Sequence, residues 1–141
     1  TLLDASDLMG QSILFPPSVK GWDGGRTWIN TSTLFVRQNV LTYLLTGRKP
    51  QGRDAGAAIE RYDPSKLVTE LAERDPAVGS DTDAMLRALA RFVVGRDSDS
   101  LLDPIRAYVS GATSSGVSPT DPRVLTGVLL LLTASPEYQL S

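Results

Sequence analysis

The chain has 141 residues, of which 41% are apolar and 21% are charged, so its length favours one globular domain. It contains no cysteine and no histidine. Their absence excludes disulfides, thiolate nucleophiles, zinc sites that need sulfur, and any catalytic arrangement built on a histidine base. Its 14 basic and 16 acidic residues give a net charge of −2, which gives no reason to expect nucleic acid as a partner.

The first residues predict a helix over 1–9 that ends at Gly10. The chain opens at Thr1 rather than at a methionine, and neither the basic start nor the continuous apolar run of a signal peptide follows. We therefore expect a processed product or a piece of a longer protein. The upstream part of the same polypeptide is then its first expected partner.

A loop over 15–30 carries both tryptophans of the chain among adjacent prolines and several glycines. Prolines stiffen its entry and glycines allow backbone conformations closed to other residues, so the loop is suited to hold one shape. In one interpretation the indoles fill gaps between helices. In the other, an indole forms a platform for a sugar ring or a peptide, beside polar contacts. The candidate binding residues are Trp22, Asp23, Arg26 and Trp28.

The apolar residues between Thr31 and Thr46 predict one long helix, closed by Gly47. Arg37 falls on this apolar helix and lies close in sequence to the tryptophan loop. A buried arginine needs carboxylate or carbonyl partners, which Asp23 or the loop backbone could supply. We predict that Arg37 pins the loop to the helix, with contact to an anionic ligand as the alternative.

Asp-Pro pairs mark helix boundaries further along the chain. Aspartate accepts hydrogen bonds from the first backbone N–H groups of a helix, and proline in the next position has no N–H to leave unpaired. Asp63-Pro64 predicts a helix to about Arg74, which Asp75-Pro76 ends. Asp121-Pro122 opens the last helix, whose apolar residues cover most of its circumference and predict the most buried element. Its apolar stretch, residues 124–132, is too short for the roughly 20 residues of a membrane span.

Two more helices are predicted between these pairs. Ser80 with an acid three residues later resembles a capping box, before a helix that Gly95 ends. Ser100 repeats the pattern before a helix that Gly111 ends, and Pro104 leaves the start of this helix open by one turn. Residues 47–62 and 112–120 are predicted to be surface loops. Because no stretch alternates with a period of two, the prediction is an all-α fold. It is a single domain over 1–141, a compact bundle of about six helices, with the long tryptophan loop between the first two.

No metal, cofactor or catalytic residue is predicted. The acidic residues of 97–103 suggest a calcium-binding loop, but Leu101 and Leu102 stand where that loop needs a ligand and a glycine. Helix capping in a solvated acidic turn is the expected role instead. The basic residues of 48–53 have no interleaved aromatic residues, so nucleic acid is not an expected partner.

Two stretches resemble a known family. The stretch near the end of the chain is Leu130 to Gln139. The stretch near its start consists of Met9-Gly10-Gln11, Leu14-Phe15-Pro16-Pro17, Val19-Lys20-Gly21-Trp22, Gly24-Gly25, Trp28-Ile29-Asn30 and Arg37. Together they resemble the bacterial family known as domain of unknown function eighteen hundred. The resemblance implies the C-terminal part of a longer helical protein that is exported to the periplasm or the cell exterior. It also implies a sulfatase-like partner family encoded nearby, and it names no reaction.

Three functions stay open at this point. The first is a non-catalytic structural or partner-binding C-terminal module of an exported protein. The second is one wall of a hydrolase or carbohydrate-processing site that upstream residues complete. The third is a stand-alone glycan-binding module, in which the tryptophan loop takes the sugar.

Overall fold

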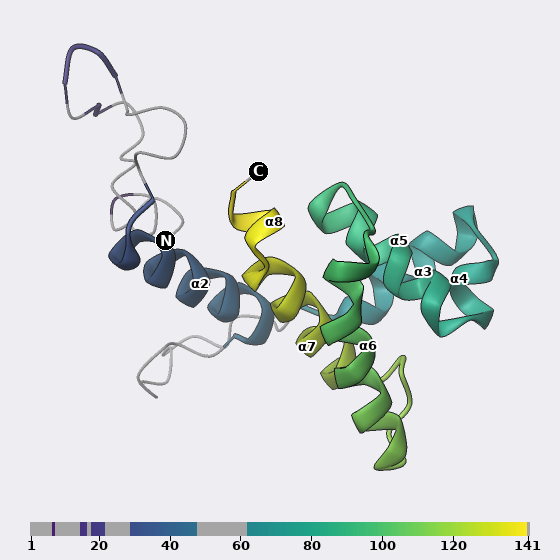
Figure 1. The fold of residues 1–141 in the computed structure, drawn as a ribbon. Helices are drawn as coiled ribbons and strands as arrows, with labels where there is room; N and C mark the ends of the chain where they lie inside the picture. Colours follow the sequence, from purple (N-terminus) through teal and green to yellow (C-terminus); the bar gives the residue numbers. More distant parts are fainter. Residues whose placement is uncertain (1–6, 8–14, 17, 22–28, 48–61, 141) are drawn as a thin grey trace. The chain divides into compact units, whose positions relative to one another are not determined.

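The computed structural model describes residues 7, 15–16, 18–21, 29–47 and 62–140 (Figure 1). The chain divides into two compact units, Thr1–Ile59 and Glu60–Ser141. All the regular elements in these described residues are helices, which confirms the predicted all-α class. The helix predicted over 1–9 lies outside the described residues except for Asp7, which is helical.

In the first unit, helix α2 spans Thr31–Thr46, as predicted. Its start is held by a reciprocal capping box, in which the Asn30 side chain accepts from the Thr33 backbone N–H at 2.9 Å. The Thr33 hydroxyl in turn accepts from the Asn30 N–H at 3.0 Å. Gly47 ends the helix with a φ of 68°, a conformation that favours glycine. Although α2 is rich in apolar residues, none of its residues is buried.

The second unit contains six helices among residues 62–140. They are α3 (Pro64–Arg74), α4 (Ala77–Ser80), α5 (Thr82–Val94), α6 (Asp99–Ser114), α7 (Pro122–Ala134) and α8 (Pro136–Gln139). Helix α5 packs against each of the other five, and α7 packs against α3, α5, α6 and α8 (Figure 1). The two helices therefore form the centre of this unit.

The core of the second unit consists of aliphatic side chains and one methionine. Helix α7 contributes more buried residues than any other described helix, as its apolar circumference predicts. Leu125, Val128 and Leu132 are completely enclosed, whereas Leu131 remains exposed. At the end of α7, the Gln139 side chain donates to the Thr133 carbonyl at 2.6 Å, which satisfies one of the acceptors that a helix end leaves open.

Helix ends in the second unit match the predicted Asp-Pro signals. Asp63 and Asp121 cap α3 and α7 by accepting backbone N–H groups at 3.0 and 2.8 Å, each with proline next in the chain. Asp75 ends α3 as expected. The short helices α4 and α8 were not predicted, because four residues give no apolar period to detect.

One predicted helix start is wrong by one residue. Ser80 belongs to α4, and Asp81 instead caps α5, because its carboxylate accepts from the N–H groups of both Asp83 and Ala84. Helix α6 starts at Asp99, within the one turn that the prediction left open around Ser100.

The predicted end of α6 is also wrong. The helix continues through Gly111 to Ser114, so the loop predicted over 112–120 begins three residues later. Gly111 does not end it, because glycine only weakens a helix interior and the buried Val109 anchors the preceding turn. Pro104 lies inside the helix, where it removes only one backbone hydrogen bond.

A close approach between α6 and α7 depends on a glycine. A Cβ atom placed on Gly127 would overlap the ring of Tyr108. The missing side chain at Gly127 thus makes room for the tyrosine against α7.

Candidate functional site

The predicted binding residues Trp22, Asp23, Arg26 and Trp28 lie outside the described residues, so their role stays a prediction. Immediately before them, residues 18–21 form a turn in which the Gly21 N–H donates to the Ser18 carbonyl at 3.0 Å. Gly21 has a φ of 87°, in the region that glycine adopts without strain.

Arg37 lies half-buried on α2, one and two turns before Val40, Leu41 and Leu44 on the same side of the helix. An arginine therefore stands among the apolar residues of this helix, as the sequence indicates. The loop that Arg37 is predicted to pin lies in residues the structure does not describe. Its pinning role stays a prediction.

Charged side chains gather between α5 and α6, and we call this group the ion-pair cluster. Its members are Asp83, Arg87, Arg91, Asp97, Asp99, Asp103 and Arg106. Four carboxylates thus meet three guanidinium groups. The cluster joins α5, the connection after Gly95, and the first half of α6.

Two carboxylates hold the cluster together. One oxygen of Asp83 accepts from Arg106 Nε at 2.7 Å, and its other oxygen accepts from Arg87 Nε at 2.8 Å. Asp99 accepts from Arg87 Nη2 at 2.9 Å and from both terminal nitrogens of Arg106 at 3.2 Å. Each of these carboxylates therefore links both arginines, so the connection between α5 and α6 is cross-braced.

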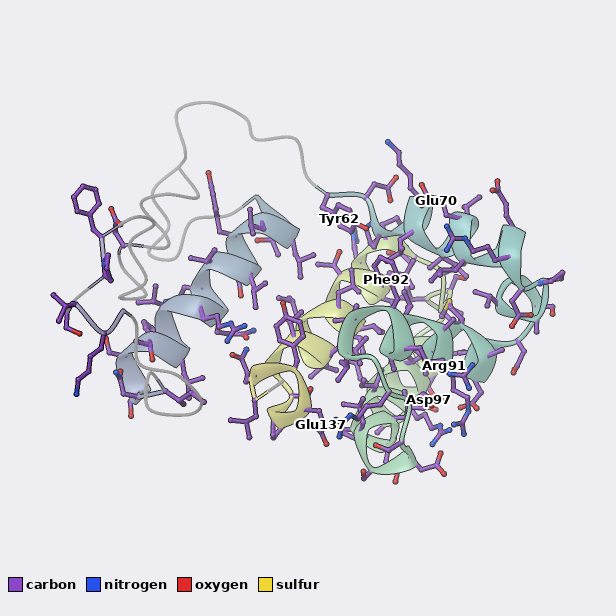
Figure 2. All side chains as sticks on the ribbon, turned by 90° about the horizontal axis from the view of Figure 1, so that it is seen from above. Tyr62, Glu70, Arg91, Phe92, Asp97 and Glu137 are labelled. Atoms are coloured by element: carbon purple, nitrogen blue, oxygen red, sulfur yellow. The ribbon has the colours of Figure 1, made fainter. Side chains whose placement is uncertain are left out.

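Two further carboxylates complete the cluster. Arg91 reaches Asp97 at 2.8 Å, and Figure 2 shows these two side chains close together. Asp103 accepts from Arg106 Nη1 at 3.1 Å, one helical turn away. With them, all four carboxylates of the cluster are paired.

The pKa values follow from these contacts. Hydrogen bonds from Arg106 and then Arg87 hold the pKa of Asp83 below its ordinary 3.8, and those from Arg87 and then Arg106 do the same for Asp99. Hydrogen bonds to Asp83 raise the pKa of Arg87 and of Arg106. Each charged form is therefore stabilised, whereas a general acid at neutral pH needs a carboxyl whose pKa is raised.

A cleft opens beside this cluster, between the start of α5 and the second half of α6. Its volume is about 550 Å³. Its lining residues are Thr82, Asp83, Leu86, Arg106, Val109, Ser110, Thr113, Ser114 and Pro119. The lining residues that belong to α6 recur at helical spacing on one face of that helix, and Pro119 comes from the loop after α6. We call this feature the α5–α6 cleft.

Sequence reasoning missed both the cluster and the cleft. It assigned the acidic residues of 97–103 to a solvated turn, whereas all three of them are ion-paired with arginines. Pairs such as Asp83 with Arg87, four residues apart, were a detectable signal. Asp83 and Arg106 are 23 positions apart, and their pairing could not be predicted without knowing how α5 and α6 pack.

Neither a metal site nor a membrane-spanning helix occurs among the described residues. No group of acidic residues there is arranged to hold a metal ion. In the same part of the chain, no helix combines the length and the apolar character needed to cross a membrane.

The chain was compared with known families, curated proteins and solved structures. The model of a family described as "Protein of unknown function (DUF1800)" matches residues 1–140. No curated protein and no solved structure matches the chain.

Proposed function

The chain belongs to the DUF1800 family, and on that basis we propose that it is a non-catalytic module of an exported bacterial protein that binds a protein partner. The partner-binding element is α2. The observation that carries the proposal is that this apolar helix has no buried residue.

The apolar side chains of α2 would be stabilised by packing against another surface. Val36, Val40, Leu41, Leu44 and Leu45 recur at helical spacing, which is typical of a helix that packs against a neighbour. Four of these five residues are half-buried, and Leu44 is 43% exposed. Phe35, on the opposite side of the helix, is 68% exposed. Exposed apolar side chains on both sides of α2 leave surface that a protein partner could cover.

The non-catalytic part of the proposal is supported by the ion-pair cluster. Its carboxylates are held ionised by guanidinium groups, and its arginines are held charged by carboxylates. Groups stabilised in one protonation state are poorly suited to move protons at neutral pH. Their geometry instead supports a structural role, bracing α5 against α6.

The first partner to test is the sulfatase-like protein implied by the family resemblance. Binding of the 141-residue chain to that protein is measured by calorimetry for the unmodified chain and for two matched variants, Phe35→Ser and Phe92→Ser. Both phenylalanines are exposed on helices, at 68% and 62%, but Phe35 lies on α2 and Phe92 on α5. Figure 2 labels Phe92 on α5.

We expect Phe35→Ser to weaken binding by about tenfold or more, because Phe35 is the most exposed large apolar side chain of α2 and a few large side chains often dominate the free energy of an interface. Phe92→Ser should bind as the unmodified chain does. Equal binding by the three proteins, or a loss confined to Phe92→Ser, would contradict the assignment to α2. An absence of binding by the unmodified chain would contradict the choice of partner.

A further inference from the structure

The α5–α6 cleft has the size of a small-molecule site. Its volume of about 550 Å³ lies within the roughly 300–1,000 Å³ of ligand pockets. It lies within the second unit and takes no residue from α2. What it would bind follows from its charges, its hydroxyl groups and its apolar wall.

The charges of the cleft are already neutralised. Its two charged side chains, Asp83 and Arg106, are paired with each other at 2.7 Å. Arg106 also donates to Asp99 and Asp103, so three carboxylates occupy most of its N–H groups. An anionic ligand would therefore meet an arginine that is already surrounded by negative charge, and the cleft favours a neutral ligand.

Four of the residues that line the cleft carry a hydroxyl group, namely Thr82, Ser110, Thr113 and Ser114. The side chains of Thr82 and Ser110 form no hydrogen bond within the described part of the chain, so both can donate to and accept from a ligand. Each oxygen of Asp83 accepts one guanidinium N–H and retains capacity for a further donor. The cleft therefore offers acceptors and donors suited to ligand hydroxyl groups.

The remaining wall is apolar. Leu86 and Val109 are buried residues that line the cleft, and Pro119 is half-buried beside them. A sugar ring carries hydroxyl groups at its edge and C–H groups on its faces, so it matches a cleft lined by both hydroxyl groups and apolar side chains. From these three observations we infer that the α5–α6 cleft binds a neutral saccharide of one or two rings.

Nuclear magnetic resonance on the isotope-labelled 141-residue chain tests this inference. The neutral probes are cellobiose, maltose and diacetylchitobiose, and a sulfated heparin disaccharide is the charged probe. We expect at least one neutral probe to shift the backbone amide signals of residues 82–86 and 106–114. The sulfated probe should leave those signals in place, because Arg106 is occupied.

Matched variants test whether the saccharide binds in the α5–α6 cleft. Ser110→Phe fills it from the exposed side of α6, and affinity should fall by about tenfold or more because the ligand is sterically excluded. Ser110→Ala should lower affinity by about three- to tenfold, the effect of one lost hydrogen bond. Ala107→Phe is the control, because Ala107 is exposed on the same helix and does not line the cleft.

Three outcomes would overturn the inference. One is that no neutral probe shifts the amide signals of the cleft at tens of millimolar. Another is binding of the sulfated disaccharide there as strongly as a neutral one. The third is an equal loss of affinity in Ala107→Phe and Ser110→Phe. None of these results bears on α2, so the partner-binding proposal is tested separately.

Discussion

Helices α2 and α7 are both apolar, yet they differ in how deeply their residues are buried. Helix α7 buries six residues in the second unit, whereas α2 buries none. Apolar composition therefore indicates that a helix packs against something, but it does not indicate which element or partner buries its side chains. For α7 the cover comes from α3, α5, α6 and α8. For α2 we have proposed a protein partner.

The largest expected effect comes from truncating one side chain in each helix. Leu125 on α7 is 0% exposed, so Leu125→Ala should lower the free energy of unfolding by about 2–5 kcal/mol through lost burial and a residual cavity. Phe35→Ala on α2 should change it by no more than about 0.5 kcal/mol. Urea titrations of both variants measure the difference. Equal losses would show that α2 is covered within the chain, and would end the comparison.

Removing the N-terminal caps of α7 and α2 should have effects of intermediate size, and these effects also compare the two helices. Asp121→Ala removes the cap of α7 and should cost about 0.5–2 kcal/mol of unfolding free energy. Asn30→Ala removes the capping box of α2. Because α2 has no buried residue, we expect faster hydrogen exchange in its first turn and no change in the unfolding of residues 62–140. Exchange rates for the Thr33 and Leu34 amides test this, and a shift of the main unfolding transition would contradict it.

The smallest expected effect concerns acid stability, and it should report on the second unit alone. The folded-state pKa values of Asp83 and Asp99 lie below 3.8. Their stabilising contribution is therefore present above about pH 4 and is lost as the pH falls through the lowered values. Asp83→Asn should reduce the melting temperature at pH 7, more at low salt than at high salt, and the deficit should shrink towards pH 3.

Glu73→Gln is the control for that measurement. Glu73 is an exposed helix acid with no ion pair among the described residues. The Glu73→Gln substitution should leave the melting temperature nearly unchanged at both pH 7 and pH 3. A deficit for Asp83→Asn that stays constant from pH 7 to pH 3 would show that the aspartate acts through packing rather than through charge.

Local signals predicted most of the second unit. The pairs at Asp63 and Asp121, the glycine at Gly95 and the apolar period of α7 each act within one or two turns, so they can be recognised from the sequence. The end of α6 was misplaced because burial of Val109 outweighs the weak helix-breaking tendency of Gly111.

The candidate site was much less predictable. The ion-pair cluster depends on Arg106 meeting Asp83 across two packed helices, and the α5–α6 cleft depends on the groove that this packing leaves. Neither the pairing nor the groove has a sequence period. The tryptophan loop was the most conspicuous feature of the sequence, and its predicted role is still open.

The contact between Tyr108 and Gly127 links two positions nineteen residues apart in a single steric constraint. A side chain at position 127 can be accommodated only if the ring at position 108 moves or is replaced by something smaller. In an alignment of family members, the two positions should therefore covary. Position 127 should be a glycine where position 108 carries a large ring, and position 108 should carry a small residue where position 127 carries a branched one. Such covariation would give the α6–α7 pairing a signature readable without coordinates.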